Sequence, residues 1–217
     1  MHTAPAPSAA PRRRRLLTIG LLAGIAASAP WSLPAARNAL SSRIAPAPED
    51  VCIVAPPTPY DPASGLAPTA ARPIPADARC PVCGMFPARS PQWAAQVIYD
   101  NGDAQFFDSP LSLFMYLQDV ARYSPGRSAD QIAAHYVTDA SMAPGGASTP
   151  WIDALSAYYV HGSSAKGPMR AGNLPAFATR EAAQAFASQR GGQVLAFGAI
   201  DAALVDRLAG TGGHNHH

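Results

Sequence analysis

The stretch Trp93–Asp108 reads WAAQVIYDNGDAQFFD and contains the strongest local signal for the fold. Its first half, Trp93–Asp100, is rich in the aromatic and β-branched residues that favour strands. The dipeptide Asn101-Gly102 follows, and it is typical of the tight turns that connect antiparallel strands. Asp103–Asp108 then returns to apolar and aromatic residues. The sequence therefore predicts a β-hairpin over these residues.

A helix is predicted directly after the hairpin. Ser109 has the side chain of a good N-cap, and Pro110 suits the first helical position. Apolar residues follow at helical spacing, among them Leu113 and Leu117. His135–Asp139, with the sequence HYVTD, then predicts a third strand. The order in this half of the chain is strand, strand, helix, strand.

The second half repeats this order. Ala154–Ser163 and Asn173–Ala178 have the residue content of strands. Thr179 is a suitable N-cap for a helix that would end at Gly191. Gln193–Phe197, with the sequence QVLAF, predicts the strand that closes the unit.

The two repeats predict an α+β fold of two tandem ββαβ modules packed together. Units of about sixty residues are too small to be very stable alone, so we expect them to share an interface. Upstream the chain is dense in proline, which favours an extended, flexible linker. Before it, Arg12–Arg15 precede the apolar run Leu16–Ala29, a pattern typical of an export signal and short for a bilayer-spanning helix. The predicted divisions are an export signal or N-terminal membrane anchor at 1–29, a flexible linker at 30–79, the first module at 80–145, the second module at 146–208, and a flexible histidine-containing tail at 209–217.

Charge and motifs exclude several classes of function. Four of the 16 basic residues lie at Arg12–Arg15, which leaves 12 to face 14 acidic residues in the rest of the chain. Nucleic-acid binding requires a clustered basic surface, so we expect no nucleic-acid partner. The sequence has no phosphate loop or dinucleotide fingerprint, and Ser163 lacks the context of a catalytic nucleophile. We therefore expect a protein that is not an enzyme.

The stretch Ala78–Phe86, ARCPVCGMF, contains a Cys-X-X-Cys pair with three possible roles. It could be a redox dithiol, although thioredoxin-like pairs lie between a strand and a helix, whereas Cys80 follows a proline-rich linker. It could be half of a structural zinc site, although the modules contain no second Cys-X-X-Cys or His-X-His pair. It could also bind a soft monovalent cation, because thiolate and thioether ligands select Cu(I), and Met85 supplies a nearby thioether. The spacing alone leaves all three open.

Four segments together resemble the NosL family of accessory proteins for nitrous oxide reductase assembly. They are CPVCGMF, AAQVIYDNGDAQFFDSPLSLFMYL, YYVHGSSAKGPM and LPAFATREAAQAFASQRGGQVLAF, and they span Cys80–Phe197. The resemblance implies an exported Cu(I)-binding metallochaperone that delivers copper for the copper centres of nitrous oxide reductase, acting with its maturation complex in the membrane. It implies a periplasmic location, with or without an inner-membrane anchor formed by an uncleaved N-terminal segment. The chain departs from the family in having no recognisable lipobox before Cys52.

The resemblance also implies the metal ligands. The family motif falls on Cys80, Cys83 and Met85, and the later Gly-Pro-Met falls on Met169. A core methionine that fills a gap between the modules is the alternative for Met169. His161 lies close to Met169 in sequence and is a further candidate, although a surface or hydrogen-bonded histidine is the commoner role.

A second resemblance predicts a different class of protein. CPVCGM also opens YHS-type domains, which would make the chain a structural or sensory heavy-metal-binding module with no delivery role. That alternative predicts further cysteines after the second strand, where this chain has Asp108 and Ser109. A thiol-disulfide oxidoreductase is the third alternative.

Overall fold

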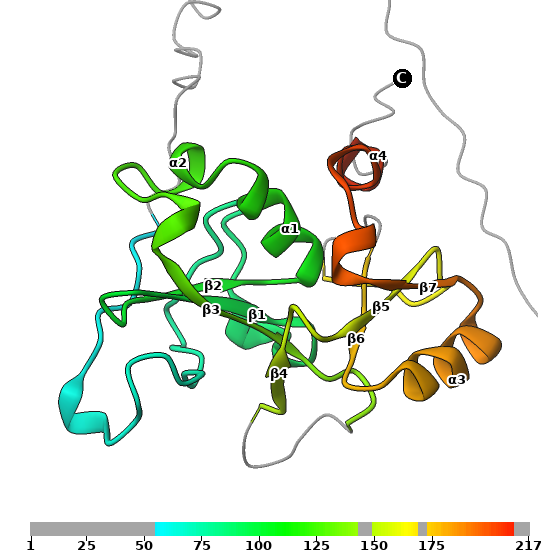
Figure 1. The fold of residues 1–217 in the computed structure, drawn as a ribbon, viewed down its shortest axis with the longest axis horizontal. Helices are drawn as coiled ribbons and strands as arrows, with labels where there is room; N and C mark the ends of the chain where they lie inside the picture. Colours follow the sequence, from blue (N-terminus) through cyan, green and yellow to red (C-terminus); the bar gives the residue numbers. More distant parts are fainter. Residues whose placement is uncertain (1–54, 143–148, 169–172, 211–217) are drawn as a thin grey trace, which may run out of the picture. The chain divides into compact units, whose positions relative to one another are not determined.

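The computed structural model describes residues 55–142, 149–168 and 173–210. The predicted export signal and most of the predicted histidine-containing tail lie outside these ranges. The described strands form two antiparallel sheets, each associated with helices (Figure 1). None of the helices in these ranges is long and apolar enough to cross a membrane.

The first sheet has the strand order β2-β1-β3-β4, with every neighbouring pair antiparallel. Its hairpin pairs β1 (Ala95–Tyr99) with β2 (Ala104–Phe107), as predicted. Gly102 in the turn has φ +85°, and a side chain there would also collide with the ring of Tyr60. The sheet continues through β3 (Ile132–Thr138) to β4 (Trp151–Asp153), a short edge strand that the sequence did not predict.

The helix that follows the hairpin is α1 (Pro110–Gln118), and α2 (Val120–Tyr123) continues from its C-terminal end. The predicted cap is confirmed, because the Ser109 hydroxyl accepts a hydrogen bond from the backbone N–H of Ser112. The apolar side chains of α1 are directed into the core, and Leu113 is fully buried. The strand end and the helix start therefore meet at a corner that the Ser109 cap and the buried side chains define.

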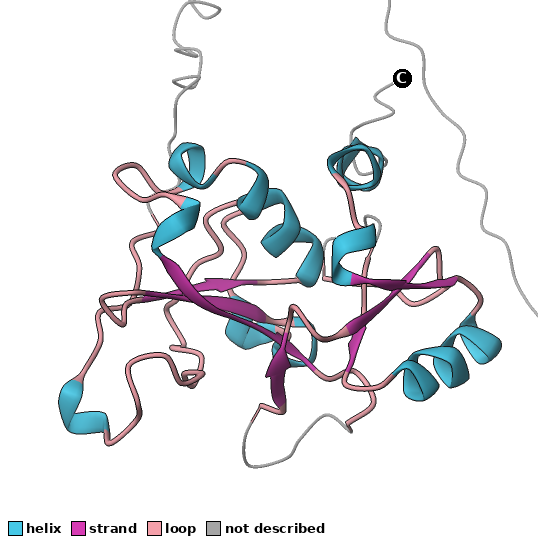
Figure 2. Ribbon diagram, viewed as in Figure 1, coloured by secondary structure: helices cyan, strands magenta, loops and turns pink. Residues whose placement is uncertain are grey.

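The second sheet has the strand order β6-β5-β7 and completes the second ββαβ unit, as Figure 2 shows. Its elements are β5 (Tyr158–His161), β6 (Ala176–Phe177), α3 (Arg180–Arg190) and β7 (Gln193–Ala196). The strands are shorter than the sequence pattern suggested. A final helix, α4 (Ala202–Gly210), was not predicted.

The two modules share one hydrophobic core, which confirms that they pack together. Buried residues of α1 and α4 belong to the same core cluster, and the two helices lie on the same side of the sheets in Figure 1, with α3 on the other side. Phe114 of α1 crosses the boundary between the modules. Its ring centroid lies 5.2 Å from that of Tyr159 on β5 and 5.0 Å from that of Phe197, which follows β7. Aromatic contacts of this kind add to the area that the interface buries.

Residues 55–79 differ from the extended, flexible linker that their proline content predicted. Thr58 forms two backbone hydrogen bonds with Ala104 of β2, at 2.7 and 2.8 Å. Arg72 is only 9% exposed, and its backbone N–H donates to the side chain of Gln96 at 2.8 Å. Its guanidinium donates to the carbonyl oxygens of Ala67, Pro68, Ala70 and Gly102. Prolines have no backbone N–H, so this segment has few donors for its own carbonyl oxygens. The buried guanidinium of Arg72 supplies those donors and thereby orders the segment.

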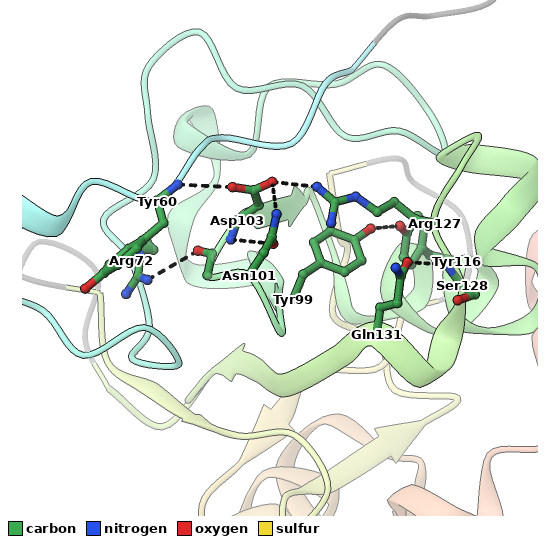
Figure 3. A network of polar contacts seen from close by, with 10 residues as sticks. Tyr60, Arg72, Tyr99, Asn101, Asp103, Tyr116, Arg127, Ser128 and Gln131 are labelled. Atoms are coloured by element: carbon green, nitrogen blue, oxygen red, sulfur yellow. Dashed lines mark hydrogen bonds and ion pairs between the residues drawn. The ribbon is translucent and has the colours of Figure 1, made fainter.

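A polar network joins this segment to the hairpin turn (Figure 3). Asp103 accepts hydrogen bonds from the backbone N–H of Tyr60 and from the side chains of Asn101 and Arg127. Burial tends to raise the pKa of Asp103, but these hydrogen bonds and the charge of Arg127 outweigh it and hold that pKa below its usual value. The chain that leads into Cys80 is therefore anchored to the first sheet.

Candidate metal centre

Cys80, Cys83 and Met85 lie on one tight turn. The backbone N–H of Cys80 donates to the carbonyl of Met85, and the backbone N–H of Gly84 donates to the carbonyl of Cys80, both at 2.8 Å. Gly84 has φ +73°, a conformation that glycine adopts without steric cost. These bonds fold the motif back on itself and bring the two thiols together.

The three sulfur-containing residues of this turn range from buried to exposed. Cys80 is fully buried and belongs to the main hydrophobic core, whereas Cys83 is half-buried and packs against that core. Both are free thiols. The side chain of Met85 is 41% exposed. A bound ion would therefore be held from the protein side by Cys80 and be approached from solvent on the side of Met85.

Asp108 is the third group at this site, and sequence reasoning did not select it as a ligand. It follows β2 directly and is 1% exposed. Its Oδ1 accepts hydrogen bonds from Cys83 Sγ at 3.2 Å and from Ser112 Oγ at 2.7 Å. The two sulfur atoms and a carboxylate oxygen of Asp108 all lie within 4.8 Å of one another. The sequence places Asp108 between the predicted hairpin and the N-cap Ser109. That position was the available signal, but only the structure shows that this corner faces the cysteine turn.

The donor atoms fit a metal ion. Oδ2 of Asp108 is buried and has no hydrogen-bond partner among the described residues. Two thiols, with the thioether of Met85 two residues further along the chain, form a donor set that suits a soft cation.

The environment of Cys83 keeps its thiol protonated. The pKa of Cys83 is strongly raised, first by its hydrogen bond with Cys80 and then by burial, with further contributions from the charges of Cys80 and Asp108. The backbone N–H of Met85 offsets this only in part. Metals bind thiolates, so an ion that binds at Cys83 must displace its proton.

Comparison with known proteins identifies the family. The NosL family model matches residues 71–205, a range that includes the cysteine turn and both modules. The chain belongs to the NosL family. It is 35% identical over 148 residues to the copper-binding lipoprotein NosL of Stutzerimonas stutzeri, an alignment that covers 63% of this chain and 70% of that protein. It is 34% identical over 130 residues to the copper-binding lipoprotein NosL of Achromobacter cycloclastes, covering 57% of this chain and 63% of that protein.

A solved NosL structure supports the same assignment. The crystal structure of the copper chaperone NosL from Shewanella denitrificans matches with a TM-score of 0.51 and 27% sequence identity. The match covers 63% of this chain and 99% of that one. The α+β fold predicted from the sequence is therefore the fold of a NosL protein.

The remaining residues that the NosL motifs predicted are placed as follows. Met169 lies outside the described residues. Gly167 lies two residues before it, and a Cβ added there would be 3.3 Å from Cβ of Asn173 and 3.9 Å from the ring of Trp93. His161 ends β5, and its buried Nδ1 has no hydrogen-bond partner among the described residues. His161 is not part of the group of donors formed by the two cysteines and Asp108.

Proposed function

We propose that this chain binds Cu(I) through Cys80 and Cys83, with Met85 and Met169 as thioether ligands, and delivers it by ligand exchange. The observation that carries the proposal is the convergence of both thiols on one tight turn. Thiolate and thioether donors select Cu(I) over harder ions. The related proteins of known name are copper-binding, which supports the same cargo.

The graded burial of the sulfur donors supports transfer rather than storage. Cys80 lies in the core and would keep its contact with the ion longest. Met85 is exposed and neutral, so it is the ligand that an incoming donor can replace first. Cys83, which is half-buried, would be exchanged next and would regain a proton as the ion leaves.

The proposed recipient is nitrous oxide reductase, reached through its maturation complex in the membrane. The support is the family membership and the NosL motifs in this chain. The proposed location is the periplasm, with the N-terminal segment either cleaved or retained as an inner-membrane anchor. The names of the two relatives as lipoproteins support an exported protein at a membrane.

The thiol-disulfide oxidoreductase alternative is disfavoured by the environment of Cys83. Redox-active dithiols depend on a thiol with a lowered pKa, because the thiolate is the nucleophile. The pKa of Cys83 is raised, mainly by its hydrogen bond with Cys80 and by burial. Cys83 is therefore a poor nucleophile until a metal displaces its proton.

An anaerobic titration with Cu(I) against a coloured competing chelator tests the proposal. The reduced protein should take up one ion, Cys83→Ser should lose most of the affinity, and Met85→Leu should lose a smaller part of it. Met142→Leu is the matched control, because Met142 is 56% exposed and does not belong to the turn. Failure to take up Cu(I), or equal affinity in Cys83→Ser, would contradict the binding proposal. Loaded protein that binds Cu(I) but never transfers it to copper-free nitrous oxide reductase would contradict delivery alone.

A further inference from the structure

Two arginines flank the cysteine turn. Arg79 immediately precedes Cys80, and Arg89 ends the short 3-10 helix Pro87–Arg89 that follows the turn. Both side chains are exposed. Their guanidinium carbons lie 4.3 Å and 4.5 Å from the ring centroid of the same residue, Phe86. Both cations therefore stack on the same aromatic ring, that of Phe86, which directly follows Met85 in the chain.

Neither member of this arginine pair is neutralised within the described part of the chain. The ion pair found there joins Arg127 to Asp103, at the hairpin turn. The additional polar contact of Arg79 is a hydrogen bond to the carbonyl of Gly84 at 3.3 Å. The two positive charges are thus presented to solvent, although the chain beyond its N-terminal arginine run is slightly acidic.

We propose that the arginine pair, Arg79 and Arg89, is a docking site for a protein partner that carries carboxylates around its own copper-binding motif. This inference rests on the proposed copper transfer. It adds that the partner's surface facing the cysteine turn is acidic. Positive charge close to the transfer site attracts an acidic partner from a distance and aligns it before ligands are exchanged.

The way the arginines are held suits this role. A guanidinium stacks on an aromatic ring and still presents its N–H groups to carboxylates in a bidentate arrangement. Stacking on Phe86 limits the rotamers of both long side chains, so less entropy is lost when they bind. The hydrogen bond from Arg79 to Gly84 fixes one of them directly to the backbone of the metal-binding turn.

A protein partner fits this surface better than an anionic membrane does. Electrostatic membrane binding generally uses clusters of about four to eight basic residues. Here only two arginines stack on one ring. The acidic residue nearest to them in sequence is Asp77, which is exposed and lies two residues before Arg79. Recognition of a few carboxylates requires no more than this pair.

The test uses two labelled peptides with the same Met-X-X-Met core, one flanked by aspartates and the other by lysines. Binding to the metal-free, full-length protein is followed by fluorescence anisotropy at low and high salt. The aspartate peptide should bind about tenfold more tightly than the lysine peptide at low salt, and the difference should shrink at high salt. The double variant Arg79→Gln/Arg89→Gln should lose this preference.

The matched control is Arg122→Gln/Arg180→Gln, which removes two exposed arginines that also stack on tyrosine rings. It changes the net charge equally and should keep the preference. Equal binding of both peptides, or an equal loss in the two double variants, would overturn the proposal. So would arginine-dependent sedimentation with phosphatidylglycerol vesicles in the absence of any peptide preference.

Copper binding is measured separately on the same variants. The arginine pair should leave the Cu(I) affinity unchanged, because it acts on the partner. If the protein fails to bind Cu(I) but still prefers the aspartate peptide, the proposed function fails and the docking site remains. If Cu(I) binds and the peptides are not distinguished, the docking site fails alone.

Discussion

Replacing Asp108 with asparagine should tighten Cu(I) binding at a fixed pH. Asparagine has nearly the same shape and keeps an oxygen that can accept the hydrogen bond from Ser112. It removes a negative charge whose Oδ1 lies 3.2 Å from Cys83 Sγ. Two thiolates and one Cu(I) carry a net charge of about −1. A carboxylate that does not bind the ion therefore repels the loaded site.

The size of this effect follows from the short distances at the site. Two unit charges about 4 Å apart interact by about 4 kcal/mol at an effective dielectric constant of roughly 20. Solvent at the half-buried Cys83 reduces this repulsion. We expect about 1–2 kcal/mol to remain, which is roughly a tenfold gain in affinity for Asp108→Asn.

A chelator competition carried out over a range of pH measures this effect. Copper must displace the proton of Cys83, whose raised pKa comes from its hydrogen bond with Cys80, from burial and from nearby charges including Asp108. Affinity should therefore rise with pH in the wild type, and Asp108→Asn should reach the same affinity at a lower pH. Asp100→Asn is the control, because Asp100 is exposed at the turn end of the hairpin. Weaker binding by Asp108→Asn would show that the carboxylate is itself a ligand and would refute the reasoning.

Three further predictions concern stability and are measured by urea unfolding. Phe114→Ala should destabilise the protein by about 3–5 kcal/mol, because it empties the aromatic contact between the modules; a loss below about 1 kcal/mol would argue against a shared core. Arg72→Met should lower the free energy of unfolding by roughly 2–4 kcal/mol, because it leaves four carbonyl oxygens without their donor. An unchanged stability would contradict the claim that Arg72 orders residues 55–79. Burial lowers the pKa of His135, with Asp153 opposing this in part, so the fold favours the neutral imidazole. Stability should then fall as the pH drops below about 6.5, and His135→Gln should make that fall less steep.

Local patterns were sufficient for the repeated ββαβ order, because each element is specified by neighbouring residues. The turn at Asn101-Gly102 and the cap at Ser109 both act within a few positions of themselves. By contrast, the order of residues 55–79 depends on Arg72 reaching Gln96 and Gly102, which lie far along the chain. Proline content predicts an extended backbone, but it does not reveal which distant group will pair with it.

The sequence by itself determined the two thiols, the neighbouring thioether and the family, since the motif CPVCGM is contiguous and its ligands need only a tight turn. The tertiary structure decided which groups surround that turn. Asp108 reaches Cys83 only because the first hairpin ends beside the cysteines, and Arg79 and Arg89 flank the turn on one ring because both stack on Phe86. Charge and burial around a metal site depend on distances through space, and these are set by the packing of elements that are separate in the chain.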